Sequence, residues 1–206
     1  MEKLGKITLY NADCMEIMKG FADKQFDLAI VDPPYGININ PNLGLRKGQE
    51  KRHKSISWDD AIPTQEYFNE LFRVSQNQII WGGNYFPLPP TKHVIFWDKL
   101  IPDGMSFSDG ELAWTSFDRA IKKYTLLNPK GNKIHPTQKP IQLYKWLLKN
   151  YAHDGDAILD THLGSASSAI AAHDGGFEFT GIELDEEYYN AAKERLILHQ
   201  RQLNLF

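Results

Sequence analysis

The sequence has one cysteine, Cys14, among its 206 residues, so the chain cannot form an internal disulfide or a cysteine-based metal cluster. No apolar run approaches the roughly 20 residues that a membrane-spanning helix needs, and we expect no membrane contact. Residues 1–6 lack the apolar stretch of a signal peptide, which together with the single cysteine favours a cytoplasmic location. The formal net charge is −3, so a nucleic-acid partner would have to be bound by local basic patches.

The rest of the composition is ordinary for a globular protein, with 42% hydrophobic and 24% charged residues, and the length suits a single domain over residues 1–206. Apolar runs of strand length alternate with segments of helical spacing. We expect strands at 7–10, 26–31, 78–81, 93–99, 111–117, 156–160 and 177–183, and helices at 14–19, 64–73, 141–151, 168–173 and 186–200. This alternation predicts an α/β fold with a doubly wound, mostly parallel sheet and helices on both faces.

The most informative stretch is Asp32-Pro33-Pro34-Tyr35, which directly follows the apolar run 26–31. Asp32 therefore lies at the carboxyl end of a buried strand, where open α/β sheets bind ligands. Because each proline fixes its own φ and restricts the residue before it, the carbonyls of Asp32 and Pro33 are held rigidly. A carboxylate, a fixed carbonyl and an aromatic ring suit an amino group on a flat heterocycle, whose developing positive charge two acceptors stabilise. A strand followed by a Pro-Pro turn with a capping aspartate is the simpler alternative.

A second group of residues lies near the end of the chain. The strand 156–160 ends in Asp160 and leads into a loop of small residues, 161–167, and then into a helix. Small residues let a ligand approach the backbone, and the start of the helix offers free N–H groups. Glu183 ends the next strand about 20 residues after the loop, where an acidic side chain binds ribose hydroxyls in such units. These features predict a nucleotide-type cofactor site.

The two groups of residues resemble the amino-methylating DNA methyltransferases. Residues 32–35 are similar to the DPPY motif of that family, and residues 135–140, HPTQKP, resemble the segment before its cofactor-binding strand. The catalytic motif comes first and the cofactor loop last, which is the circularly permuted order of the beta group. The resemblance implies a Rossmann-like fold, S-adenosylmethionine as methyl donor, and direct methylation of a flipped-out adenine at N6 without a metal.

The resemblance also implies the roles of individual residues. Asp32 and the Pro33 carbonyl would hold the target amino group in the turn that Pro34 completes, and the Tyr35 ring would stack on the base. The cofactor would be bound by Asp13, Cys14, Asp32, Thr137, Gln138, Lys139, Asp160, His162, Gly164, Ser165, Glu183 and Leu184. Asp13 is also a good N-cap for the helix at 14–19, so it has a structural interpretation as well.

The cofactor loop departs from the usual family pattern, Asp-Pro-Phe-x-Gly-Ser-Gly-Thr. Thr161 and His162 replace the proline and the phenylalanine, Ala166 replaces the second glycine, and Ser167 replaces the threonine. Ala166 is only one methyl group larger than glycine, but it does not readily adopt a positive φ. His162 is in a position to stack or hydrogen-bond beside the cofactor. These changes bear on cofactor affinity more than on the fold.

Double-stranded DNA is the partner that the resemblance implies. Two regions, 36–60 and 99–134, are left for target recognition, and the first holds a basic run at 46–54 that would contact phosphates or else form a solvated loop. The second holds a further basic group: Arg119, Lys122, Lys123, Lys130 and Lys133. Both regions are small for a site-specific enzyme, so we expect either a short target or the help of a second subunit in a homodimer.

Four residues are candidates to line the pocket for the target base: Asn84, Tyr85, Phe96 and Trp97. For Phe96 and Trp97 the alternative is a position in the hydrophobic core. Three other functions stay open. Cytosine-N4 methylation uses the same two acceptors, although aspartate at position 32 is the usual adenine form of the motif. Methylation of RNA or of a protein amide is the second. The third is an inactive cofactor-binding subunit of a restriction-modification system, against which the intact motif at 32–35 argues.

Overall fold

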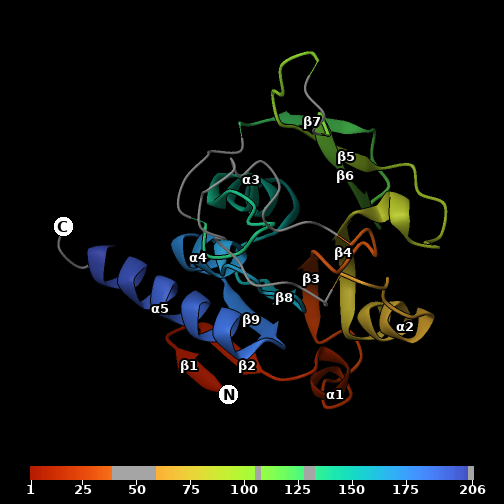
Figure 1. Ribbon diagram of the computed structural model, residues 1–206. Helices are drawn as coiled ribbons and strands as arrows, with labels where there is room; N and C mark the ends of the chain where they lie inside the picture. Colours follow the sequence, from red (N-terminus) through yellow and green to blue (C-terminus); the bar gives the residue numbers. More distant parts are fainter. Residues whose placement is uncertain (39–58, 105–107, 128–132, 204–206) are drawn as a thin grey trace.

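The computed structural model describes residues 1–38, 59–104, 108–127 and 133–203 (Figure 1). The strands in this part of the chain are β1 (Glu2–Leu4), β2 (Ile7–Asn11), β3 (Phe26–Val31), β4 (Ser75–Trp81), β5 (Val94–Asp98), β6 (Gly110–Thr115), β7 (Lys122–Thr125), β8 (Ala157–Asp160) and β9 (Glu178–Glu183). The helices are α1 (Cys14–Met18), α2 (Gln65–Val74), α3 (Ile141–Tyr151), α4 (Ser167–Asp174) and α5 (Glu186–Leu203), with a 3-10 turn, η1 (Gly83–Tyr85).

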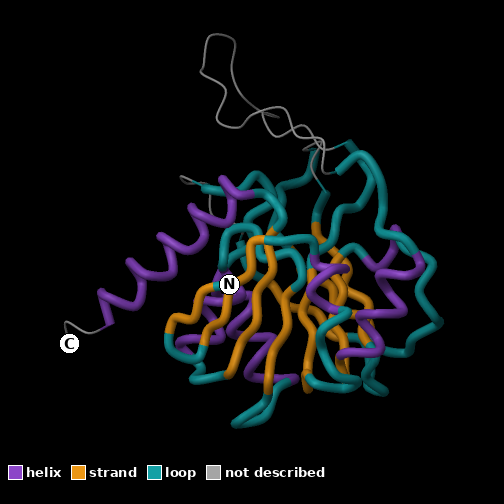
Figure 2. Tube along the Cα trace, turned by 90° about the horizontal axis from the view of Figure 1, so that it is seen from below, coloured by secondary structure: helices purple, strands orange, loops and turns teal. Residues whose placement is uncertain are grey.

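These strands form one sheet in the order β1-β2-β9-β8-β3-β4-β6-β5-β7, and they lie side by side in Figure 2. Strands β2, β9, β8, β3 and β4 run parallel to one another. Strand β1 is antiparallel to β2 at one edge, and β6 is antiparallel to both of its neighbours. The predicted α/β fold with a mostly parallel sheet is therefore confirmed.

Both faces of the sheet are buried, as the side chains of β3 illustrate. Leu28 and Ile30 pack into the hydrophobic cluster that includes α3, α4 and α5. Ala29 and Val31 pack into the cluster on the opposite face, which includes α1 and α2. Successive side chains of a strand point to opposite faces, so a central strand covered on both sides reads as a continuous apolar run.

The place of the functional site follows from two crossovers. Strand β3 leads through α2 to β4, whereas β8 leads through α4 to β9 on the other side of the β3–β8 pair. The two helices cover opposite faces of the sheet. The carboxyl ends of β3 and β8 thus meet at a topological switch point, where open α/β sheets place their ligands.

Local signals account for several element boundaries. Helix α1 begins after Asp13, whose carboxylate accepts the Met15 N–H at 2.7 Å, so the predicted N-cap is confirmed. Helix α3 begins after Pro140 and occupies the residues predicted for it. None of the helices in the described part of the chain is long and apolar enough to cross a membrane.

Other elements differ from the expectation. Strands β1 and β7 are additional, and β4 begins three residues before the predicted start at 78. Lys122 and Lys123, expected in a basic patch, lie in the edge strand β7, where Lys123 pairs with Asp98 at 3.0 Å. Arg119 donates to the Asn150 carbonyl at 3.0 Å. The basic run at 46–54 and Lys130 lie outside the described residues.

Candidate active site

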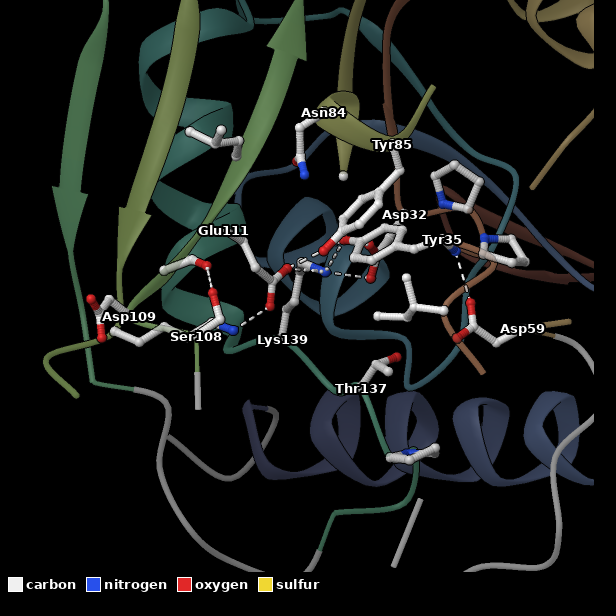
Figure 3. Close-up of a pocket in the computed structure, with 18 of the residues that line it drawn as sticks. Asp32, Tyr35, Asp59, Asn84, Tyr85, Ser108, Asp109, Glu111, Thr137 and Lys139 are labelled. Carbon is white, nitrogen blue, oxygen red and sulfur yellow. Dashed lines mark hydrogen bonds and ion pairs between the residues drawn. The ribbon is translucent and has the colours of Figure 1, made fainter. Parts of the chain in front are cut away.

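The turn after β3 places the Asp32 carboxylate between two donors (Figure 3). The Tyr35 hydroxyl donates to Asp32 Oδ1 at 2.7 Å, and Lys139 Nζ lies 2.5 Å from Asp32 Oδ2. The side chain of Lys139 is only 3% exposed. Burial raises the pKa of Asp32, an effect that the Lys139 charge opposes and the Glu111 charge reinforces. The carboxylate is thus held in a largely dry setting by one cation and one hydroxyl.

Glu111, on β6, extends this arrangement. Its Oε2 lies 2.9 Å from Lys139 Nζ, and its Oε1 lies 2.5 Å from Lys99 Nζ. Asp32, Lys139, Glu111 and Lys99 therefore alternate in charge. Figure 3 shows the side chains of Asp32, Lys139 and Glu111 converging on one another. Burial acts to raise the pKa of Glu111, but Lys139 and Lys99 outweigh it and lower that pKa to about 2. Glu111 is therefore ionised at neutral pH.

The backbone of the turn at residues 32–35 is fixed by Asp59. Its Oδ1 accepts the Tyr35 N–H at 2.8 Å and the Gly36 N–H at 3.0 Å. Asp59 is 3% exposed, so little water competes for these two hydrogen bonds. This carboxylate holds Tyr35 at the start of the loop that follows the turn.

The ring of Tyr35 lies between η1 and the turn. It stacks on Tyr85 with ring centroids 5.0 Å apart and planes 15° apart, as Figure 3 shows. A Cβ atom on Gly82 would lie 2.2 Å from the nearest atom of the Tyr35 ring, and Gly82 has φ +70°. Both the steric clash and the positive φ therefore favour glycine at this position. Tyr85 and Phe96 line the adjacent cavity. Trp97 is fully buried against Trp81, which matches the core alternative for that residue.

Two cavities meet at Asp32. The first, of about 880 Å³, includes Pro33, Tyr35, Asn84 and Glu111 in its wall. The second, of about 650 Å³, lies against the loop between β8 and α4. Four residues line both cavities: Asp32, Pro34, Thr137 and Lys139. A reaction between two separately bound molecules needs this kind of shared wall.

The second cavity brings together eleven of the twelve residues expected at the cofactor. They are Asp13, Cys14, Asp32, Thr137, Gln138, Lys139, His162, Gly164, Ser165, Glu183 and Leu184. Asp160 is absent from this lining and instead supports the loop: its carboxylate accepts the His162 N–H at 3.0 Å and the Ser168 hydroxyl at 2.6 Å. Burial raises the pKa of Asp160 to about 7, against the lowering effect of these two bonds.

The loop keeps a compact shape despite its unusual residues. Ala166 has φ +59° and ψ +22° at the N-cap of α4, so this residue adopts the left-handed conformation that alanine disfavours. The Gly164 N–H and the Asp185 N–H donate to the two oxygens of Glu183 at 2.8 and 3.0 Å. Arg195, on α5, donates to the Ser165 carbonyl at 2.6 Å. The carboxylate at the end of β9 thus ties the loop to its own strand.

Two titratable groups beside this cavity are uncharged at neutral pH. Burial lowers the pKa of His162 to about 4, although Asp13 acts to raise it. Burial, reinforced by Asp13, raises the pKa of Cys14 to about 12. The His162 ring packs edge-on against Tyr67 and its Nδ1 lies 2.9 Å from Thr161 Oγ1. Among the described residues no three His, Cys, Asp or Glu side chains gather as metal ligands.

Three residues of the site, Glu111, Lys99 and Asp59, were not predicted from the sequence. Glu111 looks like any polar position of an alternating strand, and Lys99 looks like the end of the strand before it. Asp59 lies in a polar stretch without periodicity. Each of these side chains becomes part of the site only through a contact with a segment distant in the sequence. The one feature that could have indicated them is that they are charged residues within the ranges expected to recognise the target.

Comparison with known proteins agrees with this geometry. A family model described as "DNA methylase" matches residues 109–194. The Type II methyltransferase M2.DpnII of Streptococcus pneumoniae is 29% identical over 160 residues, which is 75% of this chain and 55% of that protein. The M1.HpyAVI–SAM complex superposes with a TM-score of 0.62 at 20% identity, over 92% of this chain and 98% of the other. The cytosine-N4-specific PvuII DNA methyltransferase also gives 0.62, at 14% identity, over 97% and 95% of the two chains.

The fold, the paired cavities and these matches together support an S-adenosylmethionine-dependent methyltransferase. Within that class these matches support an amino-DNA methyltransferase of the N6/N4 type. The family that the motif at 32–35 indicated is therefore confirmed, and so is S-adenosylmethionine as the methyl donor.

Proposed function

We propose that this protein is a site-specific DNA adenine-N6 methyltransferase, with the cofactor in the second cavity and a flipped-out adenine in the first. The observation that carries the proposal is the position of Asp32 on the wall common to both cavities. A base held there presents its amino group to a methyl donor on the other side of the wall. Flipping is required because the amino nitrogen of a stacked base is out of reach of an enclosed site.

The proposed binding of the target amino group uses the rigid turn. The Asp32 carboxylate and the Pro33 carbonyl accept its two N–H groups, which frees the nitrogen lone pair and stabilises the positive charge that develops on it. Tyr35 provides a ring for stacking. The bound donor supplies a methyl group on a sulfonium that already activates it for transfer. With the donor bound, the nitrogen would gain this methyl group as the sulfur–carbon bond breaks, and it would lose one proton to water.

The residues around the second cavity fit S-adenosylmethionine. Each oxygen of the Glu183 carboxylate accepts one backbone N–H and retains a lone pair that ribose hydroxyls can use. Asp13, Cys14 and Leu184 lie near that end of the cavity and would border the adenine of the cofactor. The segment with Thr137, Gln138 and Lys139 would border its methionine end, with Gly164, His162 and Ser165 along the loop. Asp160 acts in this proposal by holding the loop.

The choice of adenine rests on Asp32, because the family's adenine enzymes usually carry aspartate at this position and its cytosine enzymes more often carry serine. Cytosine N4 remains the alternative target, since the same acceptors suit it. We propose a single domain over residues 1–206, with target recognition by 36–60 and 99–134. Double-stranded DNA is the substrate, and a homodimer would enlarge this small recognition surface.

Nucleoside mass spectrometry tests the proposal. Unmethylated DNA is incubated with the protein and methyl-deuterated S-adenosylmethionine, then digested to nucleosides. Labelled 6-methyladenine is the expected product. Labelled 4-methylcytosine would keep the mechanism but overturn the assignment of the base, and unlabelled DNA would overturn the assignment of the substrate.

A further inference from the structure

Each oxygen of the Asp32 carboxylate already accepts one hydrogen bond in this structure. Tyr35 donates to one of its oxygens and Lys139 to the other. The proposed target amino group, on which this inference rests, donates an N–H to the same carboxylate. Each carboxylate oxygen can accept a second hydrogen bond. The amino group nevertheless has to share an oxygen of Asp32 with a donor that is already bound there, and two donors on one oxygen weaken each other's bonds.

The Tyr35 hydroxyl already has a second acceptor nearby. The Tyr35 hydroxyl lies 3.3 Å from Glu111 Oε2 as well as 2.7 Å from Asp32 Oδ1. A phenolic O–H can turn about its C–O bond, so the hydrogen can change acceptor without a large movement of the ring. The ring itself is held by Gly82 and Tyr85, and its backbone is held by Asp59.

We propose that Glu111 is a positioning residue that takes over the Tyr35 hydroxyl when the target amino group binds Asp32. The exchange leaves Asp32 Oδ1 to the target amino group alone, while the Tyr35 hydroxyl stays hydrogen-bonded through Glu111. Lys139 remains between the two carboxylates, at 2.5 Å from Asp32 and 2.9 Å from Glu111. Glu111 acts through Tyr35 and Lys139 and does not itself touch the reacting atoms.

The surroundings of Glu111 suit this role. Lys99 holds its other oxygen at 2.5 Å, so the oxygen facing Tyr35 is kept in place. Lys139 and Lys99 keep its pKa far below neutrality, so it is always an acceptor. If Glu111 lost its charge, Asp32 would be the sole anionic partner of Lys139 among the described residues. Lys139 would then bind Asp32 more tightly and compete more strongly with the incoming amino group for that carboxylate.

Glu111→Gln tests the role, because it keeps the shape of the side chain and removes the charge. We expect kcat to fall roughly ten- to a hundredfold, as for the loss of a hydrogen bond to a charged group, while the Kd for S-adenosylmethionine changes less than about twofold. Glu70→Gln is the matched control: Glu70 is also ion-paired, with Arg73 at 2.8 Å, but it lies on α2 outside both cavities.

A double-mutant cycle with Tyr35→Phe separates this role from simple support of Lys139. The phenylalanine has no hydroxyl to hand over, so in that background Glu111→Gln should cost less than about threefold in kcat. An equal cost in both backgrounds, with wild-type protein still labelling DNA, overturns the role of Glu111 and leaves the proposed function intact. Wild-type protein that labels no DNA overturns the proposed function and this inference with it.

Discussion

Lys139 and Asp32 form a buried ion pair with Nζ and Oδ2 2.5 Å apart, although 107 positions separate them in the chain. The pair joins the turn after β3 to the segment before α3, and it lies on the wall that separates the two cavities. The two motifs that looked independent in the sequence are therefore one site.

Replacing Lys139 with methionine should shift the pH dependence of methylation. Burial raises the pKa of Asp32 and Lys139 opposes that shift, so loss of the lysine raises the pKa further. Asp32 is then protonated over a wider range, and the acid limb of the kcat profile moves to higher pH. An unchanged acid limb would show that Asp32 ionisation does not govern activity.

Asp160→Asn should change the pH dependence of stability. The folded-state pKa of Asp160 is raised from 3.8 to about 7, so between these values the folded protein retains a proton that the unfolded chain has lost. Stability therefore falls as pH rises through this window. Asparagine removes this contribution and can still bond both Ser168 and the His162 N–H. Urea unfolding at pH 5 and pH 7 should show a smaller difference for the variant, and an equal difference would contradict the prediction.

Gly82→Ala should abolish most methylation while leaving the binding of S-adenosylmethionine intact. The new Cβ would come 2.2 Å from the Tyr35 ring, which must move away from the turn. Gly5→Ala is the matched control, because Gly5 has φ +65° with nothing within 4 Å, so it shares the backbone strain but not the clash. Equal activity of the two variants would contradict the importance of the Tyr35 position.

Ala166 offers a test of the altered cofactor loop. Ala166→Gly relieves the left-handed strain but loses a buried methyl group, so stability should change by less than about 1 kcal/mol. Ala166→Val adds a β-branched side chain at φ +59° in a fully buried position, and we expect a loss of at least about 2 kcal/mol. Denaturant unfolding measures both, and a stable valine variant would be inconsistent with this geometry.

The parts of the site that were predictable are contiguous in the sequence. Asp32, Pro33 and Tyr35 supply a carboxylate, a carbonyl and a ring within one turn. Their combined chemistry can therefore be predicted without knowledge of the tertiary structure. Helix α3 was equally clear because Pro140 precedes a regular apolar spacing. In these cases local geometry is set by neighbouring residues alone.

The unpredicted parts depend on pairing between distant segments. Glu111 reaches Lys139 because β6 pairs with β4 and β5 in a particular register, and no local pattern encodes that register. Strand β7 was missed because its residues, Lys-Lys-Tyr-Thr, are mostly exposed at a sheet edge. The two hydrogen bonds from Ser168 and His162 to Asp160, which the resemblance places at the cofactor, likewise depend on the folded loop.

The central claim is that Asp32 holds the target amino group for methyl transfer at the boundary of the two cavities. The most direct measurement compares the wild-type protein with Asp32→Ala. Labelled methyl groups in DNA and the Kd for S-adenosylmethionine are measured on the same preparations. We predict that the variant binds the cofactor within a fewfold of wild type but transfers no detectable label. Label in DNA at the wild-type level from the variant would contradict the claim.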